Sequence, residues 1–114
     1  MIIVNSNVTV MVTNMDAAIK FYTDILELKL KNRYGNYWAD IEGPGISIGL
    51  HPAGSEVKTG YNLSIGFKVK DLDTAVSAFE QKGVQFKLHD DQQVRLALFT
   101  DPDNNALYLA QSEW

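Results

Sequence analysis

The alternation of hydrophobic and polar positions occurs twice along the chain. Residues 8–19 read VTVMVTNMDAAI, and residues 65–76, 57 positions later, read IGFKVKDLDTAV. In each segment, apolar and polar residues first alternate, which is typical of a half-buried strand. Asn14 or Asp71 can then cap a helix whose apolar residues recur at helical spacing. Such a repeat predicts two copies of one structural unit.

Each predicted helix is followed by three more strands. Short apolar runs indicate them at residues 28–31, 37–41 and 46–51 in the first copy, and at 84–88, 93–100 and 105–110 in the second. Gly83 is expected to end the second helix, and Gly43-Pro44-Gly45 predicts a turn. Each copy therefore reads as a βαβββ module.

The modules are expected to form one domain. The first spans about residues 5–52 and the second about 62–112, with a polar linker over 53–61, all within a domain of residues 1–114. This organisation predicts an α+β fold in which two βαβββ modules form a curved eight-stranded mixed sheet around a cleft.

The first strand of each module has two different faces. The apolar sets suit the side covered by the helix, and they are Val8, Val10 and Val12, then Ile65, Phe67 and Val69. The mixed sets are expected on the bare side, and they are Asn7, Thr9 and Met11, then Ser64, Gly66 and Lys68. A concavity on the bare side is the default place for a ligand.

Composition narrows the classes of function. The chain has 114 residues, enough for a core, and no cysteine, which excludes disulfides and thiolate metal sites. No apolar run reaches membrane-spanning length and no leader precedes the first strand, so we expect a cytoplasmic protein. A net charge of −4 with scattered Lys and Arg argues against a nucleic-acid partner.

Two motifs resemble the vicinal oxygen chelate superfamily, which includes glyoxalase I, extradiol dioxygenases, fosfomycin-resistance enzymes and bleomycin-binding proteins. They are NMDAAIKFYTDIL at residues 14–26 and FTDPDNN at 99–105, and the resemblance covers almost the whole chain. In the second motif, Pro102 suits a turn, and Asn104 stands where the family usually has a glycine with positive φ. We interpret this turn as structural.

The resemblance also implies a test for a metal. Metal-dependent members hold a divalent ion with His, Gln or Glu on the first and fourth strands of both modules. Carried over by position, these places fall on Asn7, Gly49, Ser64 and Tyr108. None of these four side chains supplies a carboxylate or an imidazole, so a divalent metal is disfavoured. We expect no cofactor.

The two histidines leave one alternative open. His51 is expected on the same face as Gly49, where it could contribute to a displaced metal site. His89 precedes Asp90 and Asp91 in an expected hairpin connection, where turn geometry itself selects Asp. We therefore predict no catalytic residue.

The bare sides of the two modules carry residues suited to binding a ligand. Gly49 and Gly66 would allow close approach to the sheet, and Trp38 and Tyr108 offer rings for stacking, although Trp38 could equally be structural packing. The predicted ligand-binding residues are Asn7, Thr9, Met11, Trp38, Gly49, His51, Ser64, Gly66, Lys68 and Tyr108.

Three functions follow from the resemblance. The favoured one is a metal-free small-molecule-binding protein similar to bleomycin-resistance proteins, with an aromatic or cationic ligand and a role in antibiotic resistance. The alternatives are a glyoxalase- or dioxygenase-like metalloenzyme with an atypical site, and a protein–protein interaction module. As in small two-module members of the superfamily, we expect a homodimer, with no membrane partner.

Overall fold

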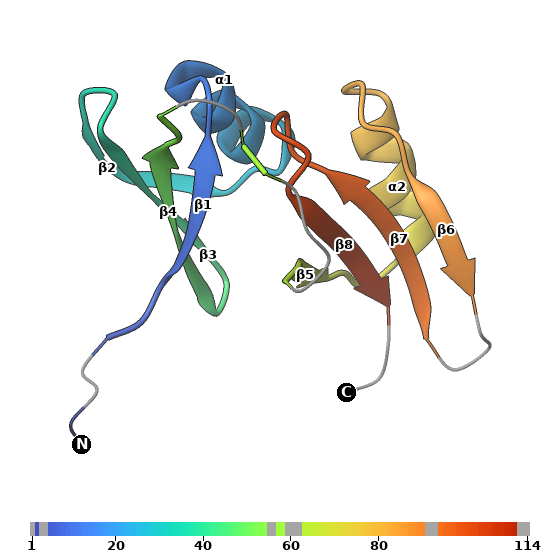
Figure 1. Cartoon of the computed structure of the whole chain (residues 1–114). Coiled ribbons are helices and arrows are strands. Elements are labelled where there is room, and N and C mark those ends of the chain that lie inside the picture. Colours follow the sequence, from blue (N-terminus) through green and yellow to red (C-terminus); the bar gives the residue numbers. More distant parts are fainter. Residues whose placement is uncertain (1, 3–4, 55–56, 59–62, 91–93, 112–114) are drawn as a thin grey trace. The chain divides into compact units, whose positions relative to one another are not determined.

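The computed structural model describes residues 2, 5–54, 57–58, 63–90 and 94–111 (Figure 1). The chain divides into two compact units, Met1–Lys58 and Thr59–Trp114. They correspond to the two predicted modules, and each is described by itself.

The first unit has four strands, an α-helix and a π-helical turn. In chain order these are β1 (Val8–Val12), α1 (Met15–Lys20), the π-helical turn η1 (Phe21–Ile25), β2 (Lys29–Tyr34), β3 (Trp38–Gly43) and β4 (Ile46–Pro52). The sheet order is β1-β4-β3-β2. Strand β1 runs parallel to β4, whereas the other two pairs are antiparallel.

The second unit repeats this arrangement. Its elements are β5 (Ile65–Lys68), α2 (Leu72–Glu80), β6 (Lys87–Asp90), β7 (Arg95–Thr100) and β8 (Ala106–Gln111), with sheet order β5-β8-β7-β6. As in the first unit, the first strand runs parallel to the last, β5 to β8, whereas β6 with β7 and β7 with β8 are antiparallel. The predicted α+β fold of two βαβββ modules is confirmed, with the eight strands divided between two four-stranded mixed sheets. No helix within the described ranges is long and apolar enough to cross a membrane.

Both helices begin at the predicted caps. Asn14 Oδ1 accepts a hydrogen bond from the Ala17 backbone N–H at 3.0 Å, and Asp71 Oδ1 accepts one from Thr74 at 3.2 Å. Both cap residues have extended backbones, which is the geometry that exposes the side chain to the free amides of the first turn. The sequence repeat is thus matched by the same type of cap hydrogen bond at the start of both helices.

The residue two positions after each cap also has the same role in both units. Asp16 pairs with Arg33 at 2.6 Å, and Asp73 pairs with Arg95 at 2.8 Å. The hydrogen bond and charge of Asp73 raise the pKa of Arg95 above its ordinary value, so this guanidinium stays charged. Each pair ties a strand to the start of the helix that covers its sheet.

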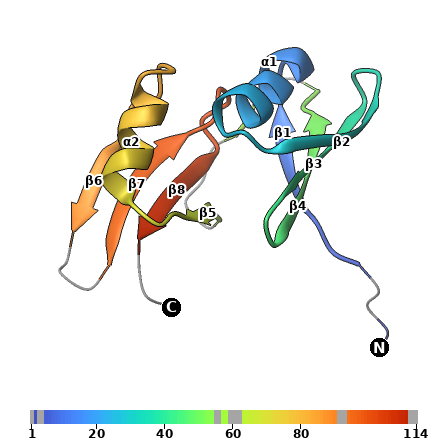
Figure 2. The ribbon, with the colours of Figure 1, turned by 180° about the vertical axis from the view of Figure 1, so that it is seen from behind.

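The helices cover one face of each sheet (Figure 2). Helix α1 packs on β3 and β4, and α2 packs on β7 and β8. On the helix-covered faces, the buried strand residues are Val10, Val12, Ala39, Ile41, Ile48 and Leu50 in the first unit, and Ala97, Phe99, Leu107 and Leu109 in the second. Val8 was expected among them, but it is 39% exposed, because the core side of β1 starts only at Val10.

The predicted strand over residues 84–88 starts later than expected. Val84 donates its backbone N–H to the Phe79 carbonyl, which extends the end of α2, and Gly83 has φ of +96°. Phe86 packs on Phe99 with ring centroids 5.0 Å apart. The apolar residues before Lys87 therefore cover the core from a connecting segment rather than from a strand.

The turn before β8 has the predicted backbone. Asn104 has φ of +64°, and the buried Asp101 carboxylate accepts backbone N–H groups from Asp103 and Asn105, each at 2.9 Å. In the equivalent turn between β3 and β4, Gly45 has φ of +74°. The motif is a structural turn in which Asn takes the place of glycine.

Candidate functional site

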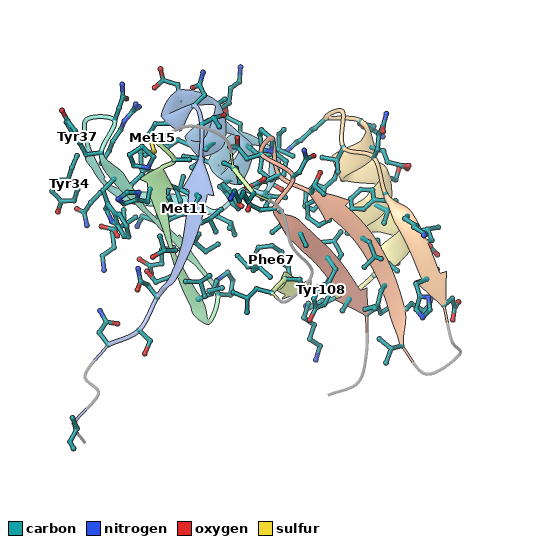
Figure 3. The ribbon with its side chains drawn as sticks, in the orientation of Figure 1. Met11, Met15, Tyr34, Tyr37, Phe67 and Tyr108 are labelled. Carbon is teal, nitrogen blue, oxygen red and sulfur yellow. The ribbon has the colours of Figure 1, made fainter. Side chains whose placement is uncertain are left out.

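The open face of the first sheet carries two neighbouring rows of side chains. Strand register places Tyr34 beside Trp38 and Met11 beside His51, and the rings of Trp38 and His51 lie 6.2 Å apart. These four residues, which we call the aromatic row, therefore cross all four strands. Tyr34 and Met11, the two ends of the aromatic row, are labelled in Figure 3.

The second row contains the polar partners. Register aligns Asn32 with Asp40, Asp40 with Gly49, and Gly49 with Thr9. Because side chains alternate along a strand, both rows lie opposite the buried residues that α1 covers. We call this second set the carboxylate row, after Asp40.

Trp38 is fixed at two places. Its indole Nε1 donates to Asp40 Oδ1 at 2.6 Å. The outer edge of its six-membered ring packs directly on Gly49, so that a Cβ atom at this position would overlap the ring. Asn7 lies beside the same glycine, with its Nδ2 3.1 Å from that Cβ position. The indole of Trp38 therefore packs on the backbone of Gly49, where only glycine leaves room for it.

Asp40 keeps capacity for a further partner. Its second oxygen, Oδ2, accepts from Asn32 Nδ2 at 3.4 Å, which is long for a hydrogen bond between these groups. An ionised carboxylate offers about four lone-pair sites. The side chain is half-buried, so its negative charge is presented on the open face beside the indole.

The open face of the second sheet has a different chemistry. Its rows are Lys87, Leu98, Tyr108 and Gly66, and His89, Leu96, Ala110 and Lys68. The hydroxyl end of Tyr108 lies over Gly66, where it occupies the space of a missing Cβ (Figure 3 labels Tyr108). This face is therefore aliphatic and basic, with one phenol.

The structure brings most predicted site residues together within their own unit. Thr9, Met11, Trp38, Gly49 and His51 share the open face of the first sheet, with Asn7 at its edge. Gly66, Lys68 and Tyr108 share that of the second, whereas Ser64 is an exposed residue just before β5. Their role in binding stays a prediction.

One expectation about the glycines is corrected. Gly49 and Gly66 were expected to leave room for a ligand, but the space above each is filled by a ring of the chain itself, from Trp38 and Tyr108. Glycine in a strand commonly marks such a close approach. The approaching group is here a neighbouring aromatic side chain.

Sequence reasoning missed Asp40 and Tyr34. Both could have been found from Trp38, because Asp40 is two residues along the same strand and Tyr34 ends the preceding strand, β2, opposite Trp38. It also missed a pocket of about 330 Å³ beside the start of α1. Its lining residues are Thr13, Asn14, Met15, Asp16, Asn36 and Pro52.

The residues at the family's chelating positions do not suit a divalent ion. In the first unit they are an amide, Asn7, and Gly49, on which an indole rests. In the second they are the hydroxyl of Ser64 and the phenol of Tyr108. Within the described ranges, no three His, Asp or Glu side chains gather as metal ligands would.

The two histidines lie in strands β4 and β6. His51 Nδ1 lies 2.8 Å from the Pro52 carbonyl oxygen. His89 and Asp90 were expected in a hairpin connection, but both lie in strand β6, where the Asp90 carboxylate is 3.5 Å from Arg95 Nε. Asp91, the third member of the expected cluster, falls outside the described residues.

Comparison with known proteins supplies the family. Solved structures with a similar fold include the genomically encoded fosfomycin resistance protein of Listeria monocytogenes, with 21% identity, a TM-score of 0.80 and coverage of 99% of this chain and 96% of that one. Lactoylglutathione lyase of Agrobacterium tumefaciens shares 14% identity with a TM-score of 0.77 and coverage of 95% and 92%.

A third similar structure is an integron cassette protein from the mobile metagenome of the Halifax Harbour sewage outfall. It has 21% identity, a TM-score of 0.78 and coverage of 95% of this chain and 99% of that one. No curated protein matches the sequence. The family model of the Glyoxalase/Bleomycin resistance protein/Dioxygenase superfamily matches residues 6–109, and the chain therefore belongs to this superfamily.

Proposed function

We propose that this protein is a metal-free small-molecule-binding member of its superfamily, similar to the bleomycin-resistance proteins. The observation that carries the proposal is the use made of Gly49. At a position where metal-dependent members hold a ligand, this chain has a glycine on which Trp38 rests. A site for an ion is thus replaced by a support for an aromatic ring.

The open faces support binding rather than chemistry. The aromatic row offers an indole, an imidazole, a phenol and a thioether, groups that contact flat organic molecules well. Binding of this kind retains a ligand without transforming it. The proposal therefore assigns no catalytic residue, and it includes a role in antibiotic resistance by sequestration.

A retained metal would contradict the proposal. Purified protein is incubated separately with Ni²⁺, Zn²⁺, Mn²⁺ and Fe²⁺, dialysed, and assayed by elemental analysis. We expect each metal to be lost, because the side chains at the chelating positions repay dehydration of a divalent ion poorly. Retention of one ion per chain would instead favour the metalloenzyme, and loss of that ion in His51→Ala would locate it.

A thermal-shift screen then searches for the ligand. The screen uses aromatic drugs and metabolites, both neutral and charged. A compound that raises the melting temperature of the wild type, but not of Trp38→Ala or Tyr108→Ala, supports the proposal. Tyr37→Ala is the control, because Tyr37 is 81% exposed and lies outside both rows. A stable protein partner without any small-molecule response would favour the interaction module.

The proposal also keeps the homodimer and the cytoplasmic location. Each sheet has a covered face and an open one, and small two-module members of the superfamily commonly form homodimers. Light scattering of the purified protein measures the mass in solution. A mass near twice that of the 12.7 kDa chain is expected. A monomer at all concentrations would contradict the proposed homodimer.

A further inference from the structure

The indole of Trp38 is oriented before any ligand arrives. A hydrogen bond at Nε1 holds one side of the ring system, and contact with Gly49 holds the edge of the six-membered ring. A freely rotating tryptophan would lose this freedom on binding, at a cost in free energy. The fixed indole therefore provides a surface that is ready for stacking.

The charge beside this surface is negative. Asp40 accepts a hydrogen bond from the indole N–H, and Glu42 is the next residue of β3 on the same face. Lys29 is the register partner of Glu42, which places it away from the indole. Arg33 pairs with Asp16 at the start of α1. A ligand over Trp38 therefore meets the Asp40 carboxylate first.

Resting on the proposed function, we infer that the ligand of the first unit is a planar organic cation that stacks on Trp38. An aromatic face attracts a cation within about 6 Å of its centre. The Asp40 carboxylate adds attraction for the same charge. Asp40 and Gly49 also act as positioning residues, because they hold the indole in place.

The second unit provides an internal contrast. Lys87 aligns with Leu98 and Lys68 with Ala110, so cationic side chains stand on both edge strands of its open face. A cationic ligand would meet like charge there. The chemistry of the two faces thus directs a cation to the first unit.

The test compares three two-ring compounds of similar size. Metal-free wild-type protein in EDTA at pH 8 is titrated by calorimetry with 1-methylquinolinium, quinoline and 1-naphthoate, which are cationic, neutral and anionic. We expect the cation to bind with a Kd lower than that of quinoline by about tenfold, the size of a partly desolvated cation–π contact. Binding of 1-naphthoate should be weaker still.

A matched pair of variants separates local from general charge. Asp40→Asn and Glu42→Gln each remove one negative charge from the same face of β3. Asp40→Asn should raise the Kd for 1-methylquinolinium about tenfold, whereas Glu42→Gln should change it by less than about twofold, since the Glu42 charge lies farther from the indole and is screened. Trp38→Phe, which keeps a ring but loses the N–H, should give an intermediate loss.

Three results would overturn the inference. They are no detectable binding of 1-methylquinolinium, equal binding of the three compounds, and equal effects of Asp40→Asn and Glu42→Gln. None of these results contradicts the proposed metal-free binding function. That function is contradicted by a different result, retention of a metal by the protein. Circular dichroism of each variant confirms that lost binding is not lost folding.

Discussion

Gly49 and Gly66 both lie under an aromatic ring, but the two contacts are built differently. Trp38 reaches Gly49 diagonally from β3 and is tied to Asp40, whereas Tyr108 reaches Gly66 from the directly paired position on β8. Each module has therefore placed its glycine on a different strand. The two modules share one strand order, but their open faces carry different side chains.

The difference extends across the two open faces. Aligned through strand register, Asp40 of the first module corresponds to Leu98 of the second, and Met11 corresponds to Lys68. One face is aromatic and acidic, while the other is aliphatic and basic. If the inference of a cationic ligand holds, a cation should prefer the first module, although both modules have the same fold.

The largest expected effect tests whether the covered faces are equivalent. Ile48 and Leu107 occupy matching positions and are both almost fully buried. Ile48→Ala and Leu107→Ala should each lower the free energy of unfolding by about 2–5 kcal/mol, through lost burial and an unfilled cavity. Urea denaturation measures this. A large loss in only one module would break the equivalence, and Val8→Ala at the partly exposed start of β1 serves as the mild control.

The next effect tests the two glycine contacts. Gly49→Ala should cost about 1–3 kcal/mol, because the new methyl group must displace an indole that Asp40 holds. Gly66→Ala should cost less than about 1 kcal/mol, because the methyl meets the outer end of a side chain that can rotate away.

A double-mutant cycle verifies the cause at Gly49. In a Trp38→Ala background the penalty of Gly49→Ala should disappear, which is the coupling expected of residues in contact. If Gly49→Ala still lowers the free energy of unfolding in the Trp38→Ala background, glycine is needed at this position for its backbone conformation and not for contact with the indole. Urea denaturation of the four proteins gives the coupling free energy.

The smallest effect compares the two turns. Gly45 and Asn104 both have positive φ. Gly45→Ala should cost about 1 kcal/mol, the strain of a Cβ in the left-handed region, and Asn104→Ala should cost about as much, because alanine lacks the short polar side chain by which Asn tolerates this region. Asn104→Gly should be neutral or slightly stabilising. Thermal unfolding distinguishes these outcomes, and a clear loss of stability in Asn104→Gly would show that the Asn side chain, rather than its backbone, maintains the turn.

The sequence predicted the features that depend on local chemistry. The caps at Asn14 and Asp71 followed from side chains that bind nearby amides, and the positive φ of Asn104 followed from the turn motif. The module order followed from the repeat. These features need only neighbours along the chain, which a sequence displays directly.

Features that depend on contacts between strands were harder to predict. The role of Gly49 requires knowledge that Trp38 lies diagonally across β3 and β4, and the role of Asp40 requires the indole orientation. The turn η1 after α1 and the positive φ of Glu27 carry no such local signature. The sequence therefore predicted which residues share a face of a sheet, whereas the contacts between them came only from the structure.

The most direct test of the account is one NMR titration. Nitrogen-15-labelled protein with Trp114→Phe, in EDTA, is titrated with 1-methylquinolinium, so that Trp38 gives the remaining indole N–H signal of a chain with two tryptophans. If the cation binds the first module, the Trp38 indole N–H and the Gly49 amide should show saturable shifts, while the Gly66 amide stays unchanged. Shifts confined to Gly66 and its neighbours, or shifts that require an added metal ion, would contradict this account.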